Sequence, residues 1–414
     1  MIAFNGVERE EDVGFYAGLI ESLFSLVQMS TMMGWGWAAD RYGRKPILVW
    51  SNAGGAIVIT LFGFGKTIWQ MILFRCMAGL FSGSVVSIRA MISENSTKKT
   101  QARAFSFWAA AGNLGIFIGP FIGGALANPA SLYPSVFGSI TLFREYPYAL
   151  ATIVAGAFSA SAAILSALFL NETLPDKIAG RKEESPMSTW QLLKSPGVAI
   201  VLVINNFCAI IGLGYTAVMP VFWYTSIRLG GYAFSPFQES IFLATFGVGQ
   251  ALWGLLALPP FQRRFGTIGI FRFAWSAWPL LFLASVAGNY LLRWVYETSF
   301  WVLSISSILL GSSISMAYTG TQLALNDIAP TPQTLGTLNA IALTVVSGVR
   351  AFVPALFGAI FATGVKYQIL DGHLVWLVLI VLAIILRIFA EWLPEKARGL
   401  PEKKFDRDEE QHLD

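Results

Sequence analysis

A short charged turn between two long apolar segments constrains this chain more than any other feature. The turn reads GWAADRYGRKP from Gly36 to Pro46 and joins the apolar segments Val13–Ala39 and Ile47–Phe64. About 20 apolar residues are enough to cross a bilayer as a helix. The turn carries three cations, and short loops rich in Lys and Arg stay in the cytoplasm. The pattern therefore predicts two membrane helices joined on the cytoplasmic side.

The composition extends this prediction to the whole chain. Of its 414 residues, 55% are hydrophobic and only 13% are charged, whereas soluble domains usually contain about 25% charged residues. The apolar runs are long and continuous and do not alternate, which favours helices over a β-barrel. We predict an all-α polytopic membrane protein, with the lipid bilayer as its main partner.

Eleven segments have the length and hydropathy of membrane spans. They are Val13–Ala39, Ile47–Phe64, Ile68–Ile92, Ala104–Ala127, Ala149–Leu170, Gly197–Tyr224, Pro236–Leu258, Ile268–Gly288, Phe300–Leu325, Leu335–Thr363 and Leu374–Leu393. Most Lys and Arg residues outside the spans lie in one alternate set of connections and in the C-terminal tail, which places that set in the cytoplasm.

The longest cytoplasmic connection divides the chain into two halves. We expect an N-terminal lobe over residues 1–170, a linker over 171–196, a C-terminal lobe over 197–393 and a tail over 394–414. The halves resemble weak parallel repeats, which are a feature of two-lobed transporters. Three pairs support this: Arg41-Tyr42-Gly43 with Arg264-Phe265-Gly266, Glu94 with Asp327, and Gly119-Pro120 with Val353-Pro354.

The sequence also excludes several classes of function. The two cysteines lie in apolar segments and there are only two histidines, so we expect neither a disulfide framework nor a metal site. No phosphate-binding glycine loop or nucleophile elbow is present, so we expect no enzyme, no cofactor and no ATP drive. The cations sit in short loops between spans, which argues against nucleic-acid binding.

Of the charged residues inside predicted spans, three stand out because they lie deep in them: Glu21, Arg75 and Arg350. A charge there costs at least about 2.5 kcal/mol, so it should face a cavity or a partner. Arg75 and Glu21 lie at similar depths, and we hypothesise that they communicate directly or through water in a proton-binding site. Arg350 is a second cavity candidate. Neutral polar residues within spans either contact substrate or hydrogen-bond between helices; these are Asn113, Asn206, Tyr215, Gln250, Gln322 and Asn339.

The charged turn resembles the signature loop between helices two and three of the major facilitator superfamily. That loop reads Gly-x-x-x-Asp-Arg-x-Gly-Arg-Lys, and its fixed positions are filled by Gly36, Asp40, Arg41, Gly43, Arg44 and Lys45. The resemblance implies the major facilitator fold of two pseudo-symmetric helical lobes. It also implies that the turn is a conformational latch, which holds the cytoplasmic side shut through charge contacts. Glu94, at the cytoplasmic end of the third span, is the expected partner of Arg44.

Two further motifs resemble the same family. Arg75 and Gly79 fit the Arg-x-x-x-Gly motif of helix four, in which the arginine lines the cavity and is linked to proton coupling. A Gly-x-x-x-Gly-Pro-x-x-Gly-Gly motif, associated with antiporters in the family, is filled by Gly115, Gly119, Pro120, Gly123 and Gly124. An earlier glycine of that motif is Ser106 here, which is a departure from the pattern.

The whole chain resembles the fungal branch of the twelve-span drug:proton antiporters, near the zinc-induced-facilitator-like proteins. The phrases GFYAG at Gly14–Gly18 and NETLP at Asn171–Pro175 support that branch, and the second phrase disfavours a sugar porter. The resemblance implies alternating access, with proton entry driving export of a small organic molecule. We expect a monomer in the plasma membrane or the vacuolar membrane.

The resemblance begins at the end of the family's helix one. Eleven spans with a cytoplasmic C-terminus would place Met1 outside, and we expect helix one to be absent from this sequence. Helix one lines the cavity in the family. The alternative function is therefore a membrane protein that does not transport, such as a sensor or a truncated product.

Overall fold

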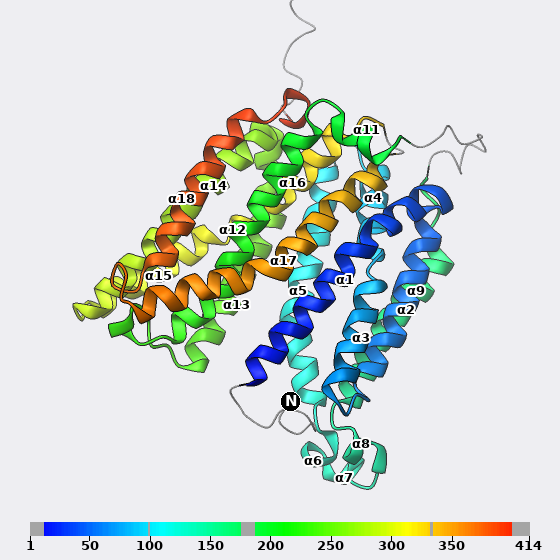
Figure 1. Ribbon diagram of the computed structural model, residues 1–414, viewed down its shortest axis with the longest axis horizontal. Coiled ribbons are helices and arrows are strands. Elements are labelled where there is room, and N and C mark those ends of the chain that lie inside the picture. The colour runs from blue at the N-terminus through cyan, green and yellow to red at the C-terminus, as the bar shows by residue number, and fades with distance from the viewer. Residues whose placement is uncertain (1–11, 98–99, 175–186, 332–333, 400–414) are drawn as a thin grey trace, which may run out of the picture. The chain divides into compact units, whose positions relative to one another are not determined.

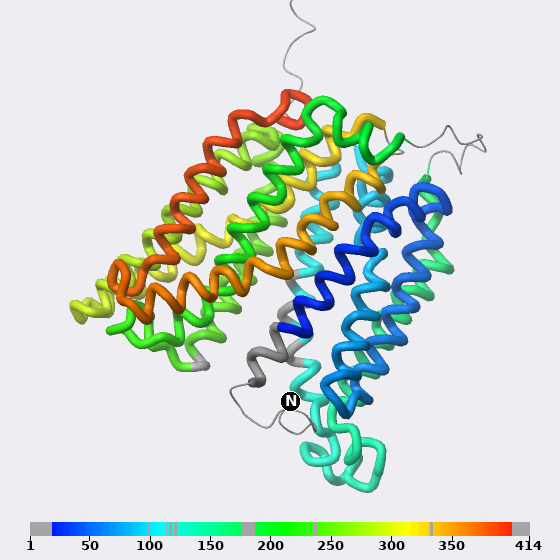
Figure 2. Tube along the Cα trace, viewed as in Figure 1, coloured from blue at the N-terminus to red at the C-terminus, as the bar shows by residue number. Residues whose placement is uncertain are grey.

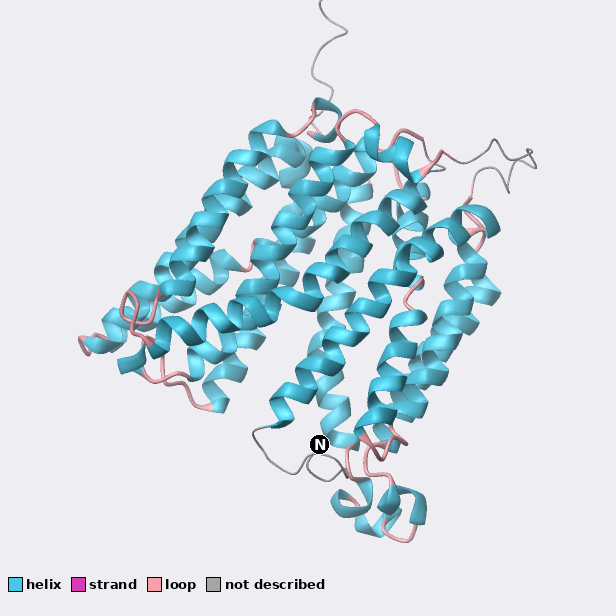
Figure 3. Cartoon of the chain, in the orientation of Figure 1, coloured by secondary structure: helices cyan, strands magenta, loops and turns pink. Residues whose placement is uncertain are grey.

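The computed structural model describes residues 12–97, 100–174, 187–331 and 334–399, and in those ranges every regular element is a helix (Figure 3). The long helices, labelled in Figure 1, are α1 (Asp12–Tyr42), α2 (Arg44–Phe62), α3 (Ile68–Leu80), α4 (Ser84–Glu94), α5 (Gln101–Leu126), α9 (Ala149–Phe169), α12 (Val198–Tyr224), α13 (Pro236–Leu252), α14 (Leu258–Arg293), α15 (Glu297–Gly311), α16 (Ile314–Ile328), α17 (Leu335–Lys366) and α18 (Leu374–Phe389).

Shorter helices fill the connections. Three of them, α6 (Pro129–Leu132), α7 (Pro134–Phe137) and α8 (Thr141–Glu145), join α5 to α9, and α11 (Thr189–Lys194) precedes α12.

Each of the eleven predicted spans coincides with helix in the described residues. Eight helices there are long and apolar enough to cross a membrane, and one of them, Gln238–Arg293, covers two predicted spans. The two remaining predicted spans coincide with α1 and α5, which have 31 and 26 residues. The predicted all-α architecture of a multi-pass membrane protein is therefore confirmed.

Two predicted spans are interrupted in the middle, and at each interruption a tryptophan side chain donates a hydrogen bond to a backbone carbonyl. The third span divides into α3 and α4, and the indole of Trp35 donates a hydrogen bond to the carbonyl of Leu80 at 2.6 Å. The ninth divides into α15 and α16, and Trp253 donates to the carbonyl of Leu309 at 2.7 Å. A freed carbonyl has no water partner inside a bilayer, so each break needs such a donor.

Contacts within the chain define two compact units. The first comprises residues 1–95, 114–192 and 329–356, and the second comprises 96–113, 193–328 and 357–414. Helices α5 and α17 contribute to both units. Figure 2 traces the chain from the N-terminus in blue to the C-terminus in red. The predicted lobes stay a prediction, and parts of the predicted linker and tail, residues 175–186 and 400–414, lie outside the described residues.

In the first unit, small residues let neighbouring helices approach closely. Helix α2 packs along α9, where a Cβ on Gly156 would lie 2.8 Å from the carbonyl oxygen of Ala56. Helix α1 packs along α3, and a Cβ on Gly79 would lie 2.7 Å from the carbonyl oxygen of Phe24. Membrane helices associate through this kind of close packing, because lipid provides no hydrophobic drive between them.

The second unit is built around α14. This helix packs against α15, α16 and α18, and α12 packs against α16 and α18. Large aromatic side chains fill the space between them, and five are almost completely buried: Phe271, Trp275, Trp278, Phe282 and Trp376. The rings of Phe271 and Trp275 stack at 4.2 Å between centroids. Aromatic pairs of this kind add stability beyond the area they bury.

The same backbone turn recurs at corresponding places in the two halves. Gly43, between α1 and α2, has φ +107°, and Gly266, which the sequence pairs with it, has φ +67° and interrupts the helical geometry of α14. Only glycine adopts such conformations without strain. The backbone thus supports the internal repeat that the sequence indicated.

We expect Gly266→Ala to destabilise the protein strongly. The new Cβ would lie 2.7 Å from the carbonyl oxygen of Gly399, on a backbone that costs other residues about 1–3 kcal/mol. Gly254→Ala is the matched control, because a Cβ there meets no atom within 4 Å. The midpoint of thermal unfolding of the purified protein tests this, and equal shifts for the two variants would contradict it.

Candidate functional site

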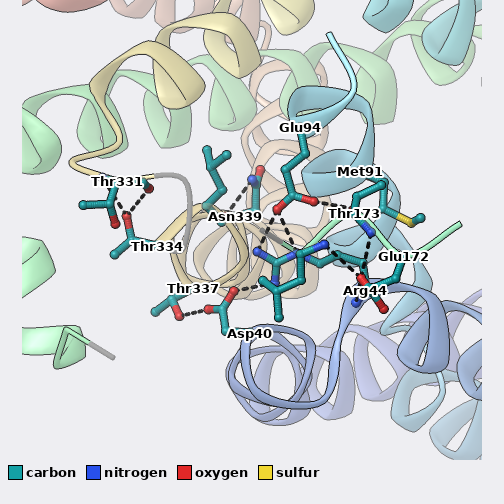
Figure 4. A network of polar contacts seen from close by, with 12 residues as sticks. Asp40, Arg44, Met91, Glu94, Glu172, Thr173, Thr331, Thr334, Thr337 and Asn339 are labelled. Carbon is teal, nitrogen blue, oxygen red and sulfur yellow. Dashed lines mark hydrogen bonds and ion pairs between the residues drawn. The ribbon is translucent and has the colours of Figure 1, made fainter. Parts of the chain in front are cut away.

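The centre of the candidate site is Arg44, a cation with no exposed surface at the start of α2 (Figure 4). Its Nη1 lies 2.5 Å from Oδ1 of Asp40, one turn earlier in the chain, and its Nε donates to Oε1 of Glu94 at 3.1 Å. Nη2 lies 3.0 Å from the same Glu94 oxygen. A buried charge is tolerated only when it is paired and hydrogen-bonded, and these two carboxylates meet that requirement.

A third carboxylate, that of Glu172, caps the start of α2. The backbone N–H groups of Arg44 and Lys45 donate to its two oxygens at 2.9 and 3.2 Å. Gly43 precedes the helix and has no side chain that could cap it. A carboxylate at this position satisfies free N–H groups and interacts favourably with the helix dipole. The segment after α9 is thereby held against the turn.

Glu94 is in turn oriented by the same segment. The hydroxyl of Thr173 donates to Oε2 of Glu94 at 2.5 Å, while the other oxygen accepts from Arg44. Only 4% of the Glu94 side chain is exposed. One polar cluster therefore joins α2, α4 and the segment after α9 with α1 and, as shown next, α17. We call this cluster the latch, and its members are Asp40, Arg44, Glu94, Glu172, Thr173 and Thr337.

Thr337 connects the latch to the C-terminal half of the chain. Its hydroxyl, in the first turn of α17, donates to Oδ2 of Asp40 (Figure 4). One turn earlier on α1, a Cβ on Gly36 would clash with Ala340 and would lie 3.2 Å from the carbonyl oxygen of Gly336. The glycine in the turn motif is thus required for the close approach of α1 to α17.

Further polar contacts follow along the same two helices. Ser347 of α17 donates to the amide oxygen of Gln28 at 2.9 Å, and Ser22 donates to the carbonyl of Ala351 at 3.1 Å. As the residue numbers increase along α1, those of their contacts on α17 decrease, so the two helices pack antiparallel. These contacts, together with Asp40 and Thr337, join the first span to the tenth.

The structure brings together some of the predicted latch residues and not others. The expected contact between Arg44 and Glu94 is present. Arg41 instead lies over the ring of Trp37, 5.2 Å from its centroid, and Lys45 joins the latch through its backbone. Sequence reasoning missed Glu172, Thr173 and Thr337. The first two directly follow an apolar span, where an acid and a hydroxyl could have indicated a helix cap.

The predicted pair of Glu21 and Arg75 is present as a loose contact. Nη1 of Arg75 lies 3.9 Å from Oε2 of Glu21, and the two side chains are 42% and 52% exposed. The guanidinium of Arg75 also lies 5.4 Å from the ring centroid of Phe62. Arg350 of α17 is exposed and acts electrostatically on Arg89 of α4.

The antiporter-type motif on α5 has open space around its glycines. A Cβ added at any of its four glycines would meet no atom of the described residues within 4 Å; these are Gly115, Gly119, Gly123 and Gly124. Close helix approach is therefore not what these glycines provide in this conformation. The side chains of Asn113 and Pro120 lie outside the described residues. Ser106, at the position of the missing glycine, donates to the carbonyl of Ala102 at 2.8 Å.

Most of the neutral polar candidates are packed inside the protein. Tyr215 is 2% exposed and its ring lies 5.5 Å from that of Phe282. The amide of Gln322 donates to Asn326 at 3.1 Å, and those of Asn206 and Asn339 donate to carbonyls four residues earlier. The backbone carbonyl of Gln250 accepts from Ser315. The side-chain bonds of Asn206, Gln322 and Asn339 named here stay within their own helices, so the choice between substrate contact and bonds between helices stays a prediction.

Comparisons with known proteins agree with this architecture. The family model described as Major Facilitator Superfamily matches residues 10–295. The chain is 44% identical over 407 residues to Efflux pump azaK of Aspergillus niger, covering 97% of this chain and 84% of that protein. It is 30% identical over 395 residues to Protein ZINC INDUCED FACILITATOR-LIKE 1 of Arabidopsis thaliana, covering 88% and 79%.

The fold is also that of a solved transporter. The human organic anion transporter MFSD10 (TETRAN) superposes with a TM-score of 0.70 at 17% identity, covering 90% of this chain and 83% of that one. At this identity the likeness concerns the fold alone. Together with the sequence relatives, it confirms the resemblance that the motifs indicated.

We expect Glu94→Gln to lower the thermal stability of the protein markedly. Removing one partner of a buried ion pair leaves the other charge uncompensated, which typically costs about 3–5 kcal/mol. Glu145→Gln is the matched control, because it breaks the ion pair with Lys66 whose partners are 52% and 48% exposed and which solvent screens. Thermal unfolding midpoints measure both, and a control that loses as much as Glu94→Gln would refute the importance of the latch.

Proposed function

The chain belongs to the major facilitator superfamily of membrane transporters, and we propose that it is a proton-coupled antiporter that exports a small organic molecule by alternating access. The observation that carries the proposal is the latch. It connects α1, from the first half of the sequence, to α17, from the second, at the end of α1 that the positive-inside rule assigns to the cytoplasm. Breaking this connection would open a path to the cytoplasm.

The latch has the properties of a reversible contact. Arg44, Glu94 and Glu172 are all held within the first half of the chain, and these contacts need not change when α17 moves. The hydrogen bond from Thr337 to Asp40 is the side-chain link to α17. A hydrogen bond to a charged group contributes about 1.5–3 kcal/mol. That is enough to bias two conformations and small enough for substrate or protons to reverse the bias.

The other end of the contact between α1 and α17 supports a rocking motion. There, Ser22 donates to a backbone carbonyl of α17, and Gln28 accepts from Ser347. Both ends are held by a few polar bonds, so one end can part while the other stays closed. Alternating access by two repeats that rock around a central site uses this kind of exchange.

Glu21 and Arg75 are the proposed proton-coupling pair. Their atoms are 3.9 Å apart, which leaves the carboxylate within reach of a proton or a water molecule. Protonation of Glu21 would weaken its attraction to Arg75 and change the charge at this depth of the helices. Such a change can be coupled to the movement of α1, the helix that also carries Asp40.

The relatives support export as the direction of transport. The Aspergillus protein is named an efflux pump and shares 44% of residues over nearly the whole of this chain. We place the protein in the plasma membrane or the vacuolar membrane, where an existing proton gradient would drive export from the cytoplasm.

We expect Thr337→Val to shift the protein toward the form that is open to the cytoplasm. The variant keeps the side-chain volume and removes the hydrogen bond to Asp40, so the ratio of the two forms should change roughly ten- to hundredfold. The readout is alkylation of Met32→Cys by an impermeant maleimide in inside-out vesicles, because Met32 of α1 has no exposed surface, packs in one cluster with Ala340 and Leu343 of α17, and is larger than cysteine.

Thr334→Val is the matched control for that experiment. Thr334 precedes the same helix, and its hydroxyl bonds, among the described residues, to the nearby backbone of Thr331 (Figure 4). Alkylation should rise in Thr337→Val and not in Thr334→Val. No rise in Thr337→Val would mean that the latch does not hold the cytoplasmic side closed.

We expect Glu21→Gln to abolish proton-driven transport. In inside-out vesicles with an acidic interior, rhodamine 6G and fluorescein serve as a cationic and an anionic probe, with a pH-sensitive dye inside. The unaltered protein should take up a probe and release protons together. The Gln variant should lose the dependence on the gradient while it keeps exchange of probe for probe. Unchanged gradient-driven uptake would exclude Glu21 as the coupling residue.

A further inference from the structure

A groove on the second unit has a cationic half and an apolar half. It has a volume of about 740 Å³ and lies between the start of α5, the segment Trp253–Ala257 and the start of α14. Three arginines line it, Arg103, Arg263 and Arg264, and so do the apolar side chains of Phe107, Leu255 and Leu256. All of these residues belong to the second unit.

The three arginines have no acidic partner among the residues that the structure describes. No ion pair joins them to a described Asp or Glu. Arg103 and Arg264 instead lie over the rings of Phe107 and Phe265, at 5.6 and 5.3 Å from the centroids. The local sequence explains this, because no acid occurs between Glu94 and Glu145 or between Glu239 and Glu297.

The two halves of the chain differ at this point. Where the first turn has Asp40 three residues before its positive-φ glycine, the corresponding position before Gly266 is Arg263. In the first turn Arg44 is therefore paired with acids of the same chain, whereas the second turn has Arg263 in the place of an acid. On α14 itself, Arg272 is neutralised by Glu391 at 2.6 Å. The charge of the groove is thus a local feature, and no acid of the described residues balances it.

The apolar half of the groove points to an anion that carries a hydrocarbon part. Leu256 and Phe107 are 69% and 55% exposed, on helices of a membrane protein. Leu255 and Leu256 belong to a π-helical segment, in which the N–H of Leu258 donates to the carbonyl of Trp253. Two prolines follow directly, Pro259 and Pro260, and they have no N–H to donate. The π segment therefore turns apolar side chains beside the arginines.

We propose that this groove binds an anionic phospholipid of the cytoplasmic leaflet, with the phosphate among Arg103, Arg263 and Arg264 and the acyl chains against Leu256 and Phe107. The positive-inside rule assigns these loops to the cytoplasmic surface, where the anionic lipids lie. Basic pockets between membrane helices on that side are suited to lipid headgroups. A guanidinium binds phosphate oxygens through paired N–H donors, which gives the site its preference for phosphate.

Native mass spectrometry of the purified full chain tests the proposal with dioleoyl phosphatidylserine and dioleoyl phosphatidylcholine as probes. We expect the serine lipid to bind more tightly, and we expect its affinity to fall about fivefold for each arginine replaced by Gln at positions 103, 263 and 264. Arg272→Gln is the matched control, because it removes the same charge from the same helix outside this groove. It should leave the preference unchanged.

Three results would overturn the proposal. They are equal binding of the two lipids, an equal loss in Arg272→Gln, and displacement of the serine lipid by an equal concentration of inorganic phosphate, which would identify a site for a free anion. If the variant with all three arginines replaced does not fold, the single variants Arg103→Gln and Arg264→Gln provide the same test with smaller effects. The measurement does not depend on transport, so its failure and that of the proposed antiport are distinguishable.

Discussion

The burial of Arg44 is the constraint on which the candidate site depends. A guanidinium without solvent contact must be surrounded by carboxylates, since its desolvation would otherwise cost several kcal/mol. Asp40 and Glu94 provide these carboxylates from α1 and α4, and Glu172 then satisfies the backbone at the start of α2. One cation therefore determines where four separate segments of the first half must meet.

This arrangement explains why the latch can hold and release α17. The internal members are fixed by several charge-assisted bonds, which are stronger than bonds between neutral groups. Asp40 is oriented by Arg44 and presents its second oxygen to Thr337. Several such bonds thus lie within the first half of the sequence, whereas the bond from Thr337 to Asp40 is the one described above between the latch and the second half. That division suits a contact that forms and breaks in a transport cycle.

The two halves of the chain share a backbone design and differ in chemistry. Both turns have a glycine with a positive φ angle, Gly43 and Gly266. In both halves a tryptophan, Trp35 or Trp253, donates a hydrogen bond to a carbonyl at a break in a helix. The first turn is capped by a carboxylate. In the second, the N–H of Ile268 donates to the backbone carbonyl of Arg398 at 3.1 Å. The second turn therefore needs no acid, and its arginines are left for another role.

The apolar spans of this chain could be predicted from the sequence alone, because a bilayer allows few alternatives to a helix of about 20 residues. The contact of Arg44 with Glu94 was also predicted from the sequence, since a shared cytoplasmic side limits the possible partners of Arg44. Breaks within spans were not foreseen. They depend on Trp35 and Trp253, which lie far from them in the sequence.

What only the tertiary structure decided were the contacts between distant segments. Thr337 has an ordinary local sequence that indicates no buried partner, and the position of Glu172 after a span could indicate a helix cap but not which helix it caps. The packing of α1 against α17 brings Thr337 to Asp40, and the path of the chain after α9 brings Glu172 to the start of α2. Hydropathy determines which segments cross the membrane, but side-chain complementarity between helices determines which of them touch.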